Sequence, residues 1–301
     1  MSVVHASQCF RKPPPFMVPS LIRHDSFHLI TADPFTGKSA LATGIAVSVA
    51  TGTPFFKGSP PCDHGRVLFF ALDAPDWDYG TLLSKVCTQK GLTPRDLADK
   101  DIPLFYVFRD QDVNIESRSK MEKFLLGAGD PLELTSPDLI VVDTVLNIHE
   151  REENDSVAMK QVMRAFTHFK GSAWILLHHN AKSPLLTGGA KSRGSTVIPG
   201  SVDMHLLLKR GRKKIPGGLS IAGEWAKGRG GDLPEKMSYS MTWDSDVLVF
   251  HPSESAHDAR GIFLSQLDPE KKYEWNELQK LAGVSGSELK LWLKGTQWER
   301  S

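Results

Sequence analysis

Short, almost wholly apolar runs recur along most of the chain, and stretches with helical spacing separate them. Runs of this kind are expected of strands that are buried on both faces. They cover residues 27–31, 66–72, 102–108, 139–142, 173–177 and 202–208, and the helical stretches cover 39–49, 79–90 and 156–169. Buried strands that alternate with helices predict an α/β fold, in which helices flank a mostly parallel sheet on both faces.

The N-terminal residues and the residues after about 218 show different sequence patterns. Residues 219–226 and 237–250 alternate apolar and polar positions, which predicts antiparallel strands. Residues 1–25 contain three consecutive prolines and are interpreted as an arm or linker. We therefore expect an N-terminal arm at 1–25, a core at 26–252 and a small C-terminal helical appendage at 257–301.

The appendage carries short helical patterns at residues 259–267, 275–282 and 287–293. Within it, residues 277–285 resemble a helix-turn-helix, with Gly283 at the turn, so a winged-helix-like contact with DNA is one interpretation. A helical hairpin that packs on the core is the alternative.

Composition narrows the class of protein but identifies no partner. The 301 residues are 40% hydrophobic and 24% charged with a formal net charge of +1, as in ordinary soluble proteins. Three cysteines without a C-x-x-C pair favour a reducing compartment. No apolar run is long enough to span a membrane, and the first residues lack the pattern of a secretory signal, so we expect a cytoplasmic protein without membrane contact.

A phosphate-binding loop follows the first buried strand. Its pattern G-x-x-x-x-G-K-[ST] is met except that an alanine replaces the first glycine. Strand, turn and helix succeed one another as this loop requires, so the backbone N–H groups would surround a nucleoside triphosphate. The predicted nucleotide-binding residues are Ala32, Asp33, Pro34, Phe35, Thr36, Gly37, Lys38, Ser39 and Ala40.

Three residues of this loop and one distant aspartate have specific expected roles. Gly37 lets the backbone close around the phosphates, Lys38 supplies a positive charge to them, and Ser39 offers a hydroxyl to Mg²⁺. Pro34 has no N–H and cannot donate. Asp143 ends a buried strand, where it would hold Mg²⁺ beside Ser39, although a helix-capping role is the alternative.

Two further strand ends carry candidate catalytic groups. Asp73 follows the second strand and could activate the attacking water, with Asp76 and Asp78 as competitors and helix capping as the alternative role. His178 and His179 end the fifth strand, where a histidine could contact the γ-phosphate or the water. The alternative is a pair of half-buried histidines whose hydrogen bonds are satisfied within the fold.

A basic segment follows these histidines. Residues 182–236 contain eleven basic and four acidic side chains, a difference of +7. The glycine-containing loop 182–196 includes Lys182, Lys191 and Arg193, which we expect to bind the phosphate backbone of a nucleic acid. A solvated basic face is the alternative interpretation.

The order of the motifs ADPFTGKS, ALDAP, LIVVDT, LLHHNAK, SRGSTVIPGSVD and AKGRGG resembles RecA-like ATPases of the RepA hexameric replicative helicase type. The resemblance covers residues 27 to about 250. It implies ATP as the nucleotide and Asp143 as the Walker-B residue. It also implies a catalytic base at Asp73, where the family usually has glutamate, and a sensor at His178 or His179.

The same resemblance implies that the chain is a helicase. Segments 147–157 and 182–196 would bind single-stranded DNA, and Lys227 and Arg229 would reach the γ-phosphate held by a neighbouring subunit of a homo-hexameric ring. The implied function is an ATP-dependent DNA helicase or translocase acting in plasmid or phage replication, with replication proteins as possible partners. The alternatives are a RecA-like recombination or strand-annealing ATPase, and a non-motor regulatory ATPase.

Overall fold

The computed structural model describes residues 12–109, 119–120, 137–149, 155–166, 171–180, 197–211, 215–230, 236–243, 246–252, 273–275, 278, 290 and 293. The chain divides into two compact units, Met1–His251 and Pro252–Ser301. The first unit contains the predicted nucleotide site and is described first.

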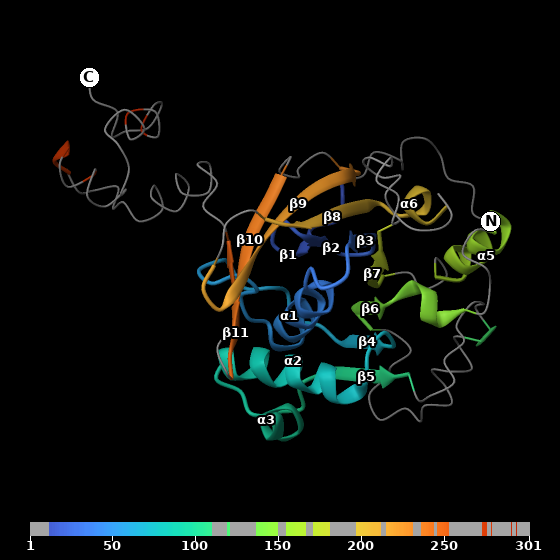
Figure 1. Ribbon diagram of the computed structural model, residues 1–301, viewed down its shortest axis with the longest axis horizontal. Coiled ribbons are helices and arrows are strands. Elements are labelled where there is room, and N and C mark those ends of the chain that lie inside the picture. The colour runs from blue at the N-terminus through green and yellow to red at the C-terminus, as the bar shows by residue number, and fades with distance from the viewer. Residues whose placement is uncertain are drawn as a thin grey trace. The chain divides into compact units, whose positions relative to one another are not determined.

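A large sheet forms the centre of the first unit (Figure 1). Its described strands lie in the order β11-β10-β9-β8-β3-β7-β6-β4-β5, and those from β8 to β5 are parallel. The parallel strands are β3 (Phe27–Ala32), β4 (Val67–Ala71), β5 (Leu104–Phe108), β6 (Leu139–Asp143), β7 (Ala173–His179) and β8 (Met204–Arg210). The remaining strands of this sheet are β9 (Gly218–Gly228), β10 (Lys236–Trp243) and β11 (Leu248–Pro252).

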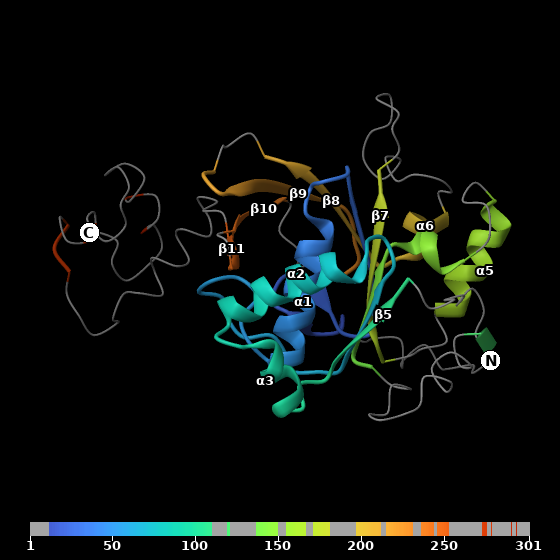
Figure 2. The ribbon, with the colours of Figure 1, turned by 60° about the horizontal axis from the view of Figure 1, so that its bottom comes forward.

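Helices cover both faces of the parallel strands (Figure 2). One face carries α1 (Lys38–Thr51), α2 (Asp76–Gln89) and α3 (Pro94–Asp99), and the other carries η2 (Val145–Ile148), α5 (Ser156–Phe166) and α6 (Val197–Ser201). Successive strand residues point to opposite faces. Phe69 accordingly packs in the core under α1 and α2, whereas Phe70 packs in the core under α5.

These features confirm the predicted α/β fold with a mostly parallel sheet flanked by helices. The six apolar runs form β3 to β8, and the alternating segments form β9, β10 and β11, of which β9 pairs antiparallel with both β8 and β10. The last parallel strand starts at Met204 and continues to Arg210, further than the apolar run 202–208, because β9 supplies it with a pairing partner.

Part of the predicted N-terminal arm belongs to the core, so the arm prediction is wrong for these residues. β1 (Phe16–Val18) pairs antiparallel with β2 (Ile22–Arg23). Met17, Val18, Leu21 and Ile22 are at most 1% exposed and pack in the core on the α1 face. Burial of the apolar side chains between Phe16 and Ile22 stabilises this pair of strands, and the proline run before them concealed the signal in the sequence. Residues 1–11 lie outside the described part of the chain.

The second unit has few described residues. Leu278 donates its backbone N–H to the carbonyl of Glu274 at 3.0 Å, and the side chains of Leu278 and Leu293 are buried. The predicted helix-turn-helix at 277–285 lies almost entirely outside the described residues. In the described parts of both units, no helix combines the length and apolar character that crossing a bilayer would require.

His28 is a buried histidine that the fold keeps neutral. Its Nε2 accepts a hydrogen bond from the backbone N–H of Arg23 at 3.1 Å, and its Nδ1 lies 3.2 Å from the Trp174 carbonyl, to which it can only donate. Burial is the main cause that lowers the pKa of His28 to about 4. As the pH falls, His28 therefore binds a proton near pH 6.5 in the unfolded chain, but only near pH 4 in the folded chain.

We predict that His28→Gln reduces the acid sensitivity of the fold. In the native chain this histidine stabilises fully above pH 6.5, and its contribution is lost as the pH falls toward 4, at up to ~1.4 kcal/mol per pH unit. The free energy of unfolding, measured by urea denaturation at several pH values between 6.5 and 4.5, should depend less steeply on pH in the variant. The difference in slope should correspond to about one proton. His64→Gln, which changes an exposed histidine, is the control. Equal slopes for native chain and His28→Gln would contradict the account.

Candidate active site

The loop between β3 and α1 has the geometry of a phosphate-binding loop. β3 ends at Ala32 and α1 begins at Lys38, immediately after Gly37. Gly37 adopts φ 89°, in the left-handed region, and a Cβ atom there would collide with the side chain of Met241. The positive φ requires glycine at this position, whereas the contact with Met241 involves the flexible end of a side chain that could move aside. The first turn of α1 directs its unpaired N–H groups toward the loop, where an anion would bind.

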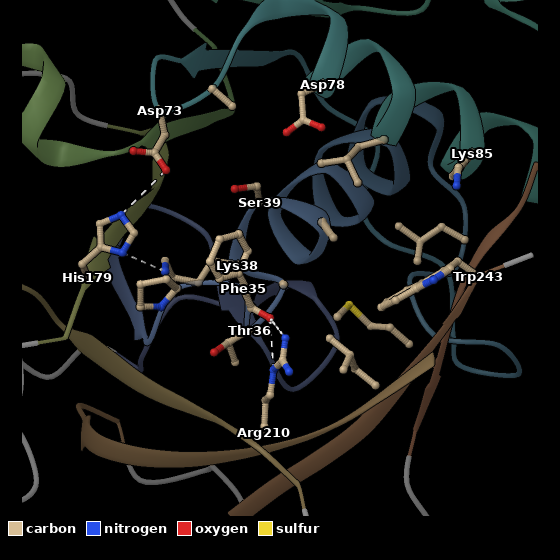
Figure 3. A pocket seen from close by; sticks show the side chains of 18 residues that line it. Phe35, Thr36, Lys38, Ser39, Asp73, Asp78, Lys85, His179, Arg210 and Trp243 are labelled. Atoms are coloured by element: carbon tan, nitrogen blue, oxygen red, sulfur yellow. Dashed lines mark hydrogen bonds and ion pairs between the residues drawn. The ribbon is translucent and has the colours of Figure 1, made fainter. Parts of the chain in front are cut away.

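A cavity of about 650 Å³ opens beside this loop (Figure 3). Its polar part is lined by the loop together with Asp73, Asp78 and His179. Its other part is lined mainly by apolar side chains, namely Leu82, Leu219, Met241, Trp243 and Leu248. A cavity of this size, with one polar and one apolar half, suits a nucleotide with its phosphates on the loop and its base against Trp243.

Lys38 lies under the loop and is only 6% exposed. Its Nζ donates to the carbonyl of Ala32 at 3.2 Å and lies 3.3 Å from Nδ1 of His179. Burial lowers the pKa of Lys38, and the negative charges of Asp143, Asp73 and Asp33 oppose this effect. The ammonium group is therefore already desolvated at the place where phosphate oxygens would replace its lost water.

His179 connects Lys38 with Asp73 (Figure 3). Because Nδ1 faces the ammonium group of Lys38, Nε2 carries the proton in the neutral ring, and Nε2 lies 3.7 Å from Oδ2 of Asp73. The interaction with His179 is the main cause that lowers the pKa of Asp73, against the opposing effect of burial. Asp73 is therefore a carboxylate at neutral pH, able to orient a water molecule.

The two histidines predicted together are placed on opposite faces of β7. His179 lines the cavity, whereas His178 is fully buried and aligned with Thr31 on the neighbouring strand. On that face the hydroxyl of Thr31 lies 3.0 Å from Nε2 of His205. Of the two candidates for the sensor, the structure brings His179 to the cavity.

Asp143 lies at the end of β6 and is fully buried. Its Oδ2 accepts a hydrogen bond from the hydroxyl of Tyr79 at 2.8 Å. Its Oδ1 has no hydrogen-bond partner of good geometry within the described chain. Burial raises the pKa of Asp143 to about 6, and the nearby hydroxyls of Ser39 and Tyr79 oppose the rise.

Mg²⁺ fits this arrangement. A buried carboxylate oxygen without a partner, close to the Ser39 hydroxyl, has the hard oxygen chemistry that Mg²⁺ prefers, either directly or through a water ligand. A bound cation would also offset the cost of burying the charge of Asp143. The residues predicted to hold the metal, Ser39 and Asp143, are therefore brought together by the fold.

Other polar residues near the loop have structural contacts. Asp76 is the first residue of α2 and accepts a hydrogen bond from the N–H of Trp77 at 2.8 Å, but the N-cap position is Pro75 and has no side-chain capping bond, so the capping role given as the alternative for Asp76 is not seen. Asp78 lines the cavity. Asn180 donates to the carboxylate of Asp33 at 3.1 Å and thereby ties the end of β7 to the loop.

Lys227 and Arg229 lie away from the cavity of their own chain. Nζ of Lys227 donates to the carbonyls of Pro199 at 3.1 Å and Gly200 at 2.8 Å in α6. Arg229 forms an exposed ion pair with Asp203 at 3.0 Å. Any contact of these two residues with a γ-phosphate would therefore have to be made with another copy of the chain.

Several lining residues were not predicted from the sequence. Arg210 at the end of β8 and Met241 and Trp243 on β10 line the cavity, and only the register of these strands places them there. Tyr79, whose hydroxyl contacts Asp143, was identified from the sequence only as the first residue of the helix predicted at 79–90. The predicted nucleic-acid contacts Lys182, Lys191 and Arg193 lie outside the described residues, as do residues 150–154 of segment 147–157.

Comparison with known proteins agrees with this geometry. A family model described as an AAA domain matches residues 1–184, which is more than half of the chain. The chain belongs to this AAA domain family. No curated protein matches it.

Two solved structures resemble this AAA domain protein. A KaiC-like protein from Pyrococcus horikoshii has 14% sequence identity and a TM-score of 0.53, over 80% of this chain and 99% of that one. The flagellar accessory protein FlaH from Methanocaldococcus jannaschii has 16% identity and a TM-score of 0.46, over 74% and 88% of the two chains. The first of these shares the fold. With the family match and the loop geometry, the AAA domain protein is a RecA-like P-loop ATPase.

We predict that Lys38→Ala abolishes ATP turnover by this AAA domain ATPase, with a loss of roughly a hundredfold or more, because the phosphates lose their buried counter-charge. Steady-state phosphate release measures the loss. Lys57→Ala removes an exposed lysine that does not line the cavity and serves as the control. Turnover by Lys38→Ala within threefold of the control would mean that the loop is not the catalytic site.

Proposed function

We propose that this ATPase is a ring-forming DNA translocase, a helicase of the RecA-like hexameric type, which hydrolyses ATP between subunits and moves on single-stranded DNA during replication. The observation that supports it is the distribution of positive charge around the cavity. Among the described residues that line it, the lysine and arginine side chains are Lys38, Lys85 and Arg210.

None of these described cations is an arginine directed at the side of Asp73 and His179. Lys85 lies toward Trp243, at the opposite end of the cavity (Figure 3). Arg210 donates to the carbonyl of Phe35. Transfer of a phosphoryl group builds up negative charge that enzymes of this class neutralise with an arginine, often supplied by another chain. The site therefore has the composition expected of one that a neighbouring subunit completes.

Arg229 is a suitable donor for that role. Its side chain is 64% exposed, and its ion pair with Asp203 is on the surface, where such pairs contribute little free energy. A phosphate could replace Asp203 at small cost. Lys227, two residues earlier on β9, would accompany it if its bonds to α6 were exchanged for the phosphate.

The residues of the chain itself would perform the remaining steps. Lys38 would leave the Ala32 carbonyl for the phosphates, and His179 would then be free to donate Nε2–H or to contact the γ-phosphate. Asp73, held as a carboxylate, would orient the attacking water. Bound Mg²⁺, held by Ser39 and Asp143, would neutralise phosphate charge.

The assignment of single-stranded DNA as the partner rests on the sequence. The basic loop 182–196 begins three residues after His179, so a change at the γ-phosphate would be close to any nucleic acid that the loop binds. The charge of +7 over residues 182–236 suits a phosphate backbone. A closed ring, which we expect to be a homo-hexamer, requires a heterologous interface between copies of the chain.

We predict that single-stranded DNA stimulates the ATPase roughly tenfold or more, because the loop that would bind the DNA begins close to His179 in the nucleotide site. The stimulation should weaken steeply as the salt concentration rises. Phosphate release with and without an oligonucleotide measures it, and Lys38→Ala protein provides the background rate. Equal rates with and without DNA would contradict the motor and favour the regulatory alternative. Helical filaments on DNA, seen by electron microscopy in place of rings, would instead favour the recombination alternative.

A second prediction concerns the donated arginine. Arg229→Ala should still bind ATP but hydrolyse it at least a hundredfold more slowly. After subunit exchange in an equal mixture with Lys38→Ala, roughly one quarter of all interfaces would pair an intact loop with an intact arginine, so about that share of activity should return. Each variant incubated alone is the control. If the exchanged mixture stays inactive, the arginine is not donated between subunits.

A further inference from the structure

The phosphate-binding loop contains a strained residue that has no packing of its own. Phe35 adopts φ 59°, in the left-handed region that residues other than glycine enter only at a cost in free energy. Its side chain is 86% exposed, so it buries little surface that could repay this cost. An interaction of the backbone must therefore hold this conformation.

Arg210 makes that interaction. Its Nη2 and Nε donate to the carbonyl oxygen of Phe35 at 2.6 and 3.2 Å, so two donors of one guanidinium converge on a single acceptor (Figure 3). The backbone of Arg210 is itself held by the sheet, because β8 pairs at this residue with Ile221, which is fully buried. The side chain thus reaches the loop from a fixed position.

The bound carbonyl determines the direction of a phosphate-binding N–H group. The carbonyl of Phe35 and the N–H of Thr36 belong to one planar trans peptide, so fixing the carbonyl fixes the N–H in the opposite direction. The loop has one such donor fewer than usual, because Pro34 has no N–H. Loss of the correct orientation at Thr36 would therefore weaken phosphate binding more than in a loop with a full set of N–H groups.

We propose that Arg210 is a positioning residue for the phosphate-binding loop, which it holds in its binding conformation through the carbonyl of Phe35. The role requires that Arg210 acts on the loop and not on the nucleotide. It depends only on nucleotide binding and is independent of the DNA-dependent activity proposed above. A substitution at position 35 separates an action of Arg210 on the loop from an action on the nucleotide, because glycine there would adopt φ 59° without strain.

The test compares the affinity of the full chain for Mg²⁺·ATPγS, measured by isothermal titration calorimetry, in four proteins: native, Arg210→Ala, Phe35→Gly and the double variant. Arg210→Ala should weaken binding roughly three- to tenfold, the range for an ordinary hydrogen bond, because solvent exposure screens the charge of the guanidinium. Phe35→Gly should bind within about twofold of the native chain, and in that background Arg210→Ala should cost less than about twofold.

Two further variants make the result specific. Arg210→Lys keeps the positive charge beside the cavity but loses the fork of two donors, so it should weaken binding nearly as much as Arg210→Ala. Lys209→Ala removes the neighbouring exposed cation, which pairs with Glu224 at 3.4 Å, and should leave affinity unchanged. Thermal unfolding midpoints identify any variant that fails to fold; if Arg210→Ala does, Arg210→Lys made alone and in the Phe35→Gly background takes its place.

Three results would overturn the proposal. A loss from Arg210→Ala that is equally large with glycine at position 35 would mean that Arg210 contacts the nucleotide directly. Native affinity in both Arg210→Ala and Arg210→Lys would mean that the bonds to Phe35 do not matter. A tenfold or larger loss from Phe35→Gly alone would mean that the aromatic side chain, and not the backbone at this position, serves binding.

Discussion

The parallel hydrogen bonding of β3, β7, β6 and β4 is the constraint on which the site depends. Parallel strands end at one edge of the sheet, so residues separated by more than a hundred positions in the sequence are brought to one place. Asp73, Asp143 and His179 follow or end three of these strands, and the phosphate-binding loop follows the fourth. Register then selects the face: Asp143 and His179 point toward α1, whereas His178 points away from it.

Burial at this edge gives the groups their chemical character. Lys38 and Asp143 are both desolvated, which lowers the pKa of the lysine and raises that of the aspartate. Each buried charge is only partly compensated by its neighbours in the protein. A triphosphate with Mg²⁺ supplies negative charge beside the Lys38 ammonium and positive charge beside the Asp143 carboxylate. The site is therefore complementary to the triphosphate and the cation together.

The sequence predicts those parts of the site that depend on local pattern. The loop from Ala32 to Ser39 is a contiguous motif, and Asp143 is found by its position after four apolar residues. The choice between His178 and His179 needed only the strand alternation, once β7 was placed. Arg210, Met241 and Trp243 could not be predicted, because the pairing register of β8 to β11 depends on turns and long-range contacts that no local pattern encodes. The burial of Met17 and Ile22 was missed because short strands carry a weak signal beside a proline run.

The central claim is that the loop ahead of Lys38 binds a triphosphate whose Mg²⁺ is held by Ser39 and Asp143. The most direct measurement is a crystal structure of the chain with a nonhydrolysable ATP analogue and Mg²⁺. The account predicts phosphate density on the loop amides, metal density beside the Ser39 hydroxyl and Asp143 Oδ1, and the base near Trp243. Saturating ligand that leaves this cavity empty, or that binds elsewhere on the chain, would contradict it.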